Sequence, residues 1–162
     1  MSRPTLRSQL FTFRGRTNRA KYWMTALIAL AIYVVGGSAL WVLRAGTQGM
    51  IALNGPLLIA LGVGGLGAYV LGSVIGIFAA IRRLHDRDKS GHWLWLFYFV
   101  PSVLNVVVQL MMPPGANPQA VNPVVLVPML VSLVLIIWGV VQLGFLRGTP
   151  GANRFGADPL QA

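Results

Sequence analysis

One short stretch of the chain holds most of the side chains that could do chemistry. Residues 82–92 read Arg-Arg-Leu-His-Asp-Arg-Asp-Lys-Ser-Gly-His. His85 beside Asp86 resembles a metal or phosphohydrolase dyad, and Asp88 and His92 are further candidate ligands. A metal hydrolase needs at least three well-placed ligands and usually a separate base, whereas half of these residues fall on a short loop. We therefore predict no metal, no cofactor and no catalytic residue here.

A second group of residues suits the binding of anions. A guanidinium group can bind a phosphate through two N–H donors. Anionic phospholipid headgroups are the simplest such partner, and each basic residue near a membrane surface contributes about 1 kcal/mol to their attraction. The arginines that we expect to contribute are Arg14, Arg16, Arg19, Arg82, Arg83, Arg87 and Arg154.

The same arginines can instead be neutralised inside the protein. Asp86 lies four residues after Arg82 and three after Arg83, so a helix continuing to this point would allow either pair. A structural clasp of this kind would tie the loop to the C-terminal tail. Its residues would be His85, Asp86, Asn153 and Asp158. The sequence leaves a clasp and a ligand site as open alternatives.

Composition predicts that membrane-spanning helices position these residues. The chain is 56% hydrophobic and only 10% charged, with a mean hydropathy of +0.69. A hydrocarbon core about 30 Å thick requires about 20 apolar residues of helix. Continuous apolar runs without alternation favour helices over a barrel. We therefore predict an all-α polytopic membrane protein with four transmembrane helices, at about residues 18–43, 57–84, 93–112 and 124–146.

The charged residues limit the classes of function. A net charge of +10 would suggest nucleic acid for a soluble protein, but these charges border apolar runs, so we expect a membrane and no nucleic acid. The chain has no cysteine and no glutamate, and its only carboxylate side chains are Asp86, Asp88 and Asp158. Disulfides and thiolate catalysis are excluded, and acid–base chemistry is severely limited.

The sequence predicts three parts of the chain, a membrane domain with a polar segment on either side. Residues 1–21 form a basic segment that is either a short amphipathic helix on the membrane surface or a disordered tail. Residues 22–146 form the membrane domain, whose first helix has Thr17 as a candidate N-cap. Residues 147–162 are rich in glycine and proline and are predicted to be a turn-rich tail.

Small residues recur every four positions along the second predicted helix. Such a stripe lets another helix approach closely, and residues 72–76 have the GxxxG form of it. The stripe comprises Gly64, Ala68, Gly72, Gly76 and Ala80. Its partner is either another helix of the same chain, which we favour, or a second copy in a homo-oligomer.

Basic residues predict the orientation of the protein. Twelve of the thirteen Lys and Arg residues fall on the N-terminal segment, the 82–92 loop and the tail, and Arg44 alone falls on the other side. Cytoplasmic segments of membrane proteins carry an excess of Lys and Arg. We therefore expect both termini in the cytoplasm. If the arginines bind no anion, their role is to fix this orientation.

Three motifs together resemble a known family. They are Phe13-Arg14-Gly15-Arg16 with Arg19, Tyr22 and Trp23; Arg82-Arg83-Leu84-His85-Asp86 with Ser90, Gly91 and Trp93; and Gly151, Asn153-Arg154-Phe155-Gly156 and Asp158-Pro159. In this order they resemble the bacterial inner-membrane family catalogued as domain of unknown function 805, over essentially the whole chain. That family usually has Trp where this chain has His92. The resemblance implies a small integral protein of the bacterial inner membrane with cytoplasmic motifs, and it implies no particular activity.

Three functional hypotheses follow from these observations. The first is an interaction or scaffold protein whose cytoplasmic arginine and aromatic layer binds anionic lipid headgroups or a partner protein. The second is a membrane enzyme acting on a phosphorylated lipid through His85 and Asp86. The third is a small-solute channel, for which Ser102, Asn105 and Gln109 share one helix face, although no ionisable residue lies near the midplane.

Overall fold

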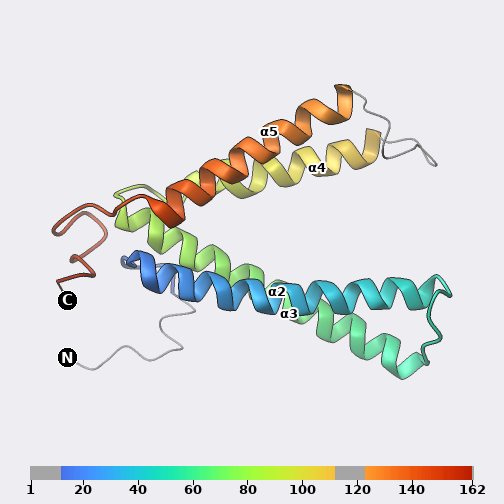
Figure 1. Ribbon diagram of the computed structural model, residues 1–162. Helices are drawn as coiled ribbons and strands as arrows, with labels where there is room; N and C mark the ends of the chain where they lie inside the picture. Colours follow the sequence, from blue (N-terminus) through green and yellow to red (C-terminus); the bar gives the residue numbers. More distant parts are fainter. Residues whose placement is uncertain (1–11, 112–122, 162) are drawn as a thin grey trace.

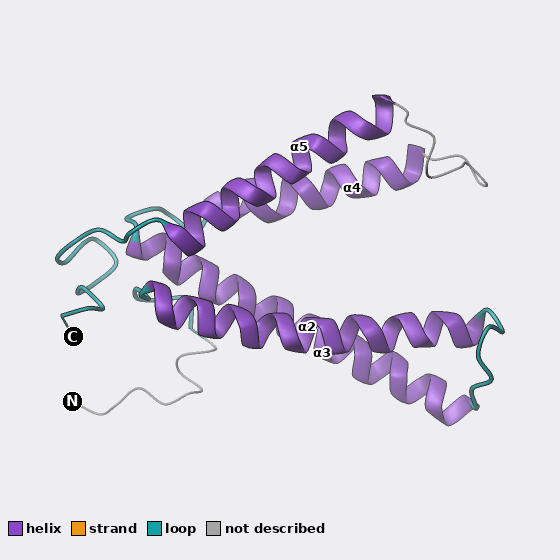
Figure 2. Ribbon diagram, in the orientation of Figure 1, coloured by secondary structure: helices purple, strands orange, loops and turns teal. Residues whose placement is uncertain are grey.

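The computed structural model describes residues 12–111 and 123–161, and every regular element in this part of the chain is a helix. Figures 1 and 2 show helices and loops in this part of the chain and no strand. The all-α prediction is therefore confirmed there. The elements in chain order are α2 (Arg19–Thr47), α3 (Gly55–Asp86), the π-helical segment η1 (Trp95–Phe99), α4 (Val100–Met111), α5 (Pro123–Val140) and the π-helical segment η2 (Val141–Phe145).

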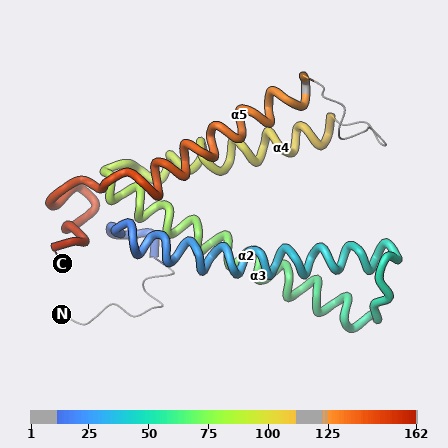
Figure 3. Tube along the Cα trace, in the orientation of Figure 1, coloured from blue at the N-terminus to red at the C-terminus, as the bar shows by residue number. Residues whose placement is uncertain are grey.

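The helices form two antiparallel hairpins, one of α2 with α3 and one of α4 with α5 (Figure 3). The hairpins meet at one end and diverge toward the other, so that the chain has the shape of a V (Figure 1). The end where they meet holds residues 12–18, the connection 87–94 and the segment 146–161. We call it the basic end, because most of the described cations lie there.

Three of these helices are long and apolar enough to cross a bilayer. They are Arg19–Thr47, Gly55–Asp86 and Val125–Phe145, with mean hydropathies of 2.2, 2.0 and 2.5. The remaining apolar helix, Trp95–Met111, is shorter. At a rise of 1.5 Å per residue it extends about 25 Å, close to the thickness of a hydrocarbon core. The four predicted helices are therefore all present.

Two helix boundaries differ from the prediction in ways that matter for the site. The N-cap of α2 is Asn18, whose side chain accepts the N–H of Lys21 at 2.9 Å, and not Thr17, which is buried. The end of α3 is Asp86, two residues beyond the predicted boundary. Because the helix continues to Asp86, its carboxylate lies one turn from Arg83 on the same face.

Two predicted features lie mainly outside the described residues. The interfacial helix predicted for the N-terminal segment falls mainly on residues 1–11. The loop predicted between the last two helices, residues 113–123, falls on 112–122 except for Pro123, which is the first residue of α5. Residues 12–18, which are described, are not helical.

Close packing of α2 on α3 depends on glycines spaced by seven residues. A Cβ on Gly72 would lie 2.8 Å from the carbonyl oxygen of Ala29, and one on Gly65 would lie 3.1 Å from the Cβ of Ala39. Ala79, seven residues further along, is fully buried. At about 100° per residue a seven-residue step drifts by only about 20°, whereas a four-residue step drifts by about 40°.

The predicted four-residue stripe therefore winds around α3. Gly72 and Gly76 face α2, and Ala80 is fully buried. Ala68 is half-buried. A Cβ on Gly64 would contact nothing within 4 Å. Gly72 and Gly76 thus make their contacts with α2 of the same molecule.

The hydrophobic core lies at the basic end, where both hairpins contribute to it. Tyr22, Ala79, Ala80, Leu84, Phe97 and Leu143 form a buried cluster. The π-helical turn η1 brings Phe97 into it, and this turn ends two residues before Pro101. Because proline has no N–H to donate, a regular ladder of hydrogen bonds cannot continue through this point.

Candidate functional site at the basic end

Asp86 is the centre of a buried ion-pair cluster. It is 3% exposed. Its Oδ1 lies 3.1 Å from the Nη2 of Arg16, and its Oδ2 pairs with the guanidinium group of Arg83. The backbone carbonyl of Asp86 accepts the N–H of Thr149 at 2.8 Å. One residue thus joins the segment before α2, the end of α3 and the C-terminal tail.

Arg16 extends this cluster into the tail. Its side chain is 1% exposed, and it donates to the carbonyl oxygens of Thr149 at 2.6 Å and Gly151 at 2.5 Å. A buried charge is tolerated when it is paired and its remaining donors are satisfied. Arg16 meets both conditions, so its role in this structure is to hold the tail against α3.

The continuous helix of α5 and η2 ends at Phe145, and its C-terminal end is capped by side chains from the other hairpin and from the connection that follows it. The last carbonyl groups of a helix have no partner within the helix, and the helix dipole makes this end favourable for cations. Five consecutive carbonyl oxygens each accept a side-chain donor: Gln142 from Arg87, Leu143 and Leu146 from Arg83, Gly144 from Trp23, and Phe145 from Arg19. We call Gln142–Leu146 the capped carbonyl run.

Arg83 belongs to both the Asp86 cluster and the capped carbonyl run. Its Nε donates to the carbonyl oxygen of Leu143 at 2.8 Å, while another nitrogen of the same guanidinium pairs with Asp86. The residue is 1% exposed. This buried guanidinium group therefore connects the Asp86 cluster to the second hairpin.

His85 and Asp86 are neighbours in sequence but their side chains have different partners. The His85 ring stacks on Phe155, with centroids 3.9 Å apart and planes within 4°, and its Nδ1 lies 3.3 Å from the carbonyl oxygen of Gly15. Asn153 donates to the backbone carbonyl of His85 at 2.9 Å. These contacts hold the tail in place, and they do not aim the imidazole at the Asp86 carboxylate.

Asp158 stabilises a turn of the tail and not an arginine. Its two carboxylate oxygens accept the backbone N–H groups of Gly151 at 3.0 Å and Leu160 at 2.9 Å. These hydrogen bonds, from Leu160 first and then Gly151, hold the pKa of the Asp158 carboxyl below its ordinary value.

The remaining predicted arginines have separate environments. Arg154 pairs with Asp88 at 3.0 Å on the surface, with both side chains about half exposed. Arg82, on α3, is buried and donates to the carbonyl oxygen of Phe78 on the preceding turn at 3.4 Å. Arg14 is exposed. The seven arginines therefore do not converge on one anion, and in the described chain no three His or Asp side chains are grouped to hold a metal ion.

Sequence reasoning missed two glycines of this region. A Cβ on Gly144 would lie 2.5 Å from the Trp23 ring, and one on Gly148 would overlap the Asp86 carboxylate. Gly148 lies in a segment whose glycines and prolines predict turns, so the sequence gave no signal that Gly148 also packs against the Asp86 carboxylate. Trp23 is part of the first of the three motifs, but the sequence does not reveal that its indole N–H donates to the Gly144 carbonyl oxygen, because that contact depends on the fold.

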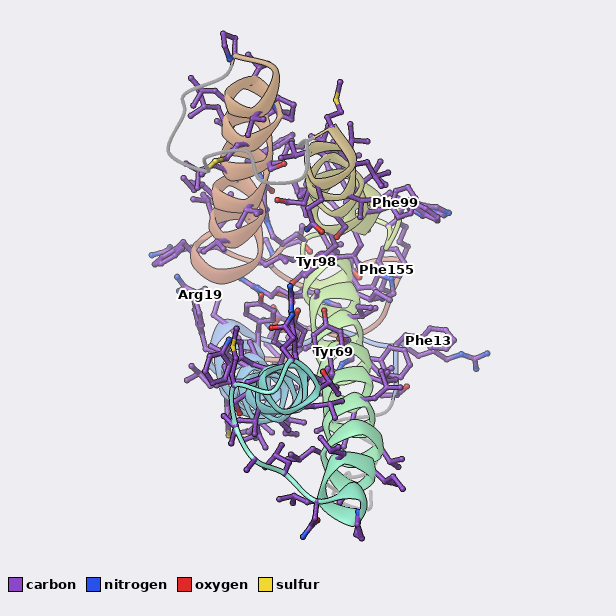
Figure 4. The ribbon with its side chains drawn as sticks, turned by 90° about the vertical axis from the view of Figure 1, so that its right-hand side faces the viewer. Phe13, Arg19, Tyr69, Tyr98, Phe99 and Phe155 are labelled. Carbon is purple, nitrogen blue, oxygen red and sulfur yellow. The ribbon has the colours of Figure 1, made fainter. Side chains whose placement is uncertain are left out.

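A groove with a volume of about 610 Å³ opens between the start of α2 and the tail. Arg19 and Arg147 line it, and both are exposed. Asp86 and Asp158 also line it, with their oxygens engaged as described above. Figure 4 shows Arg19 at the edge of the molecule, on the opposite side from Phe13.

The apolar helical hairpins and their polar basic end define a small polytopic helical membrane protein. The chain belongs to the family described as Protein of unknown function (DUF805), whose sequence model matches residues 10–157. The expectation drawn from the three motifs is thereby confirmed.

Its relatives include three Escherichia coli (strain K12) proteins. Inner membrane protein YhaI is 30% identical over 148 residues, covering 91% of this chain and 85% of its own length. Inner membrane protein YhaH is 28% identical, with 91% and 86% covered, and Uncharacterized protein YiiR is 29% identical, with 95% and 90% covered. No solved structure matches the chain. The protein is therefore a multi-pass protein of the bacterial inner membrane.

Proposed function

We propose that this protein binds anionic phospholipid headgroups at its basic end, in the groove between the start of α2 and the tail. The observation that carries the proposal is the pair of exposed arginines, Arg19 and Arg147, lining one groove of about 610 Å³. They lie where α2 begins and η2 ends, which is the depth of the headgroup layer in a spanning protein. An exposed Lys21 adds a further cation beside them.

The chemistry of the groove suits a phosphate diester. Guanidinium groups bind phosphate oxygens through paired N–H donors, and the first turn of α2 adds the positive end of a helix dipole. The two carboxylates of the groove weaken this attraction less than their number suggests. Asp86 is paired with two arginines, and Asp158 is bonded to backbone N–H groups.

The structure limits which substitutions can test lipid binding. Replacing Arg83 removes a buried contact between the hairpins, and replacing Arg19 removes a donor from the capped carbonyl run. Arg147→Gln is the better variant, because Arg147 is exposed and lies outside that run. Arg154→Gln is the matched control, since Arg154 is an exposed basic-end arginine that already pairs with Asp88.

The experiment measures binding of the purified full chain to vesicles of phosphatidylglycerol in phosphatidylcholine. We expect preference for the anionic vesicles, a loss of about fivefold in affinity for Arg147→Gln, and less than twofold for Arg154→Gln. Raising the salt concentration should weaken binding. Equal binding to zwitterionic vesicles, or equal losses in the two variants, contradicts the proposal. Competition by millimolar inorganic phosphate would reveal a site for free anions instead.

The proposal includes an orientation with both termini in the cytoplasm. It is supported by the placement of residues 12–18, the 87–94 connection and the segment 146–161 at one end of the molecule, with the loop 48–54 at the other. The chain has no cysteine, so single cysteines can be introduced at Ser90 and Gln48 and labelled in intact cells. Only the cysteine at position 48 should react with a membrane-impermeant maleimide, and labelling at position 90 contradicts the orientation.

The geometry supports the two other hypotheses less well. An enzyme using His85 and Asp86 would need a free carboxylate, whereas Asp86 is engaged by two arginines. For a channel, Asn105 and Ser102 would have to face a polar path. Both donate instead to carbonyl oxygens of the preceding turn, those of Pro101 at 2.8 Å and Tyr98 at 2.7 Å.

A further inference from the structure

A second groove lies between the two hairpins, in the membrane-spanning part of the molecule. It has a volume of about 770 Å³ and is lined by α2 and α3 on one side and by η1 and α4 on the other. Sites for small molecules commonly have volumes of about 300–1,000 Å³. The groove is also accessible from the side, because Trp95 and Phe99 at its edge are more than half exposed.

All four tyrosines of the chain line this one groove. They are Tyr22, Tyr33, Tyr69 and Tyr98. Figure 4 labels Tyr69 and Tyr98, which lie between the two hairpins. Tyrosines at the ends of spanning helices are expected, since their amphipathic rings favour the interface. That account covers Tyr22, near the start of α2, but it does not cover the whole set.

Tyr33 and Tyr69 lie near the middle of their helices, away from either interface. Tyr33 is fourteen residues from Arg19, where α2 begins, which corresponds to a depth of about 21 Å. The two hydroxyl groups are hydrogen-bonded to each other at 2.6 Å, and their rings are 4.4 Å apart. One of the two O–H groups therefore donates to the other, and the second proton is left to donate elsewhere. In hydrocarbon a hydroxyl without an acceptor is costly.

The groove carries hydroxyl groups and no charge. None of the described residues that line it is Lys, Arg, Asp, Glu or His. A charged headgroup would be unfavourable at this depth without a counter-charge. The charged headgroup of a phospholipid keeps its ester groups near the interface, so their carbonyls are not the natural partners of Tyr33 and Tyr69. An uncharged, hydrophobic molecule with carbonyl oxygens meets each of these conditions.

We propose that the groove between the hairpins binds an uncharged, membrane-soluble lipid whose carbonyl oxygens accept hydrogen bonds from the Tyr33 and Tyr69 pair. The aromatic and glycine faces of the groove hold its apolar tail. Quinones and diacylglycerols share this chemistry. A quinone has ring carbonyls attached to a hydrocarbon tail, and a diacylglycerol has ester carbonyls attached to hydrocarbon chains. The site is distinct from the headgroup groove at the basic end, since the two sets of lining residues do not overlap.

The test uses the full chain in detergent and decylubiquinone as the probe. Quinones quench tryptophan fluorescence on contact, and Trp95 lines the groove. We expect saturable quenching, most of which is lost in Trp95→Phe. In the double variant Tyr33→Phe with Tyr69→Phe, which keeps both rings, the affinity should fall about tenfold because hydrogen bonds to the ligand are lost. The matched control is Ser38→Ala, on α2 outside the groove, with unchanged affinity.

Two competitors identify the chemistry that is recognised. Displacement by dioleoylglycerol but not by decylbenzene, which has no carbonyl, supports a site for carbonyl lipids that includes esters. Displacement by neither supports a site that prefers quinones. Equal displacement by decylbenzene, or quenching that is linear in probe and equal in all variants, overturns the proposal. If the double variant does not fold, Tyr69→Phe and the competition on the unaltered protein give the same decision.

Discussion

Gly148 lies directly against the carboxylate of Asp86, so closely that a methyl group at position 148 would overlap Oδ2. This contact lets the tail pass the end of α3 while Thr149 donates to the backbone carbonyl of Asp86. The approach of the two residues is possible only because glycine has no side chain. The tail is therefore fitted to the buried ion-pair cluster.

Gly148→Ala should destabilise the protein by about 1–3 kcal/mol, the usual cost of forcing an extra group into a packed site. The neighbouring atoms are a buried carboxylate held by two arginines, so they cannot easily move. The measurement is thermal unfolding in detergent, followed by circular dichroism. Gly37→Ala is the matched control, because a Cβ there meets nothing within 4 Å, and no loss is expected. Equal midpoints for the two variants would contradict the packing described.

Asp86→Asn should be among the most damaging single substitutions. It leaves the buried Arg16 and Arg83 without their counter-charge, and removing one partner of a buried ion pair costs about 3–5 kcal/mol. Asp88→Asn is the matched control, since the Asp88 pair with Arg154 is exposed and such pairs contribute about 0–1 kcal/mol. Urea or heat unfolding of both variants checks the difference. If Asp86→Asn unfolds with the same midpoint as Asp88→Asn, the cluster does not hold the hairpins together.

The helices and the basic end could be predicted from the sequence because their signals are local. Long runs without charge identify spanning helices, and the uneven placement of Lys and Arg gathers the polar residues into one layer. Even the pairing of Arg83 with Asp86 was accessible, since it needs only a helix that continues for two residues past the predicted boundary.

The role of the arginines could not be decided from the sequence, because their main partners are backbone carbonyls. Arg83 donates to Leu143, sixty residues away, and any residue type would present the same oxygen. Which carbonyls need a donor depends on where η2 ends and how the hairpins meet. For the same reason the four tyrosines, which are far apart along the chain, gave no sign that they share a groove.

The glycines of α3 should differ in importance according to their place on the helix. Gly72→Ala places a Cβ about 2.8 Å from the Ala29 carbonyl oxygen, so α2 and α3 must separate, at a cost of about 1–3 kcal/mol. Gly64→Ala, in the same predicted stripe, adds a methyl group in open space and should be neutral or stabilising, because alanine favours helix. Unfolding in detergent measures both. A destabilising Gly64→Ala with a neutral Gly72→Ala would instead point to a contact with a second copy.

The tail should loosen in acid because of Asp158. Its pKa is lowered in the folded protein by the N–H groups of Leu160 and Gly151, so the ionised form is the one that stabilises the turn. This contribution is fully present above the ordinary pKa of about 3.9 and is lost as the pH falls through the lower, folded value. Amide exchange at Gly151 and Leu160 should therefore become less protected, relative to the helices, only below about pH 4.

Asp158→Asn provides the check on this assignment, because a neutral amide keeps one acceptor oxygen and loses the charge. In this variant Gly151 and Leu160 should be less protected at neutral pH, and their protection relative to the helices should no longer change in acid. Asp88→Asn, whose carboxylate pairs with Arg154 on the surface, should keep the acid-dependent change. A tail that loosens equally in acid with and without the Asp158 carboxylate would show that Asp158 does not control the transition.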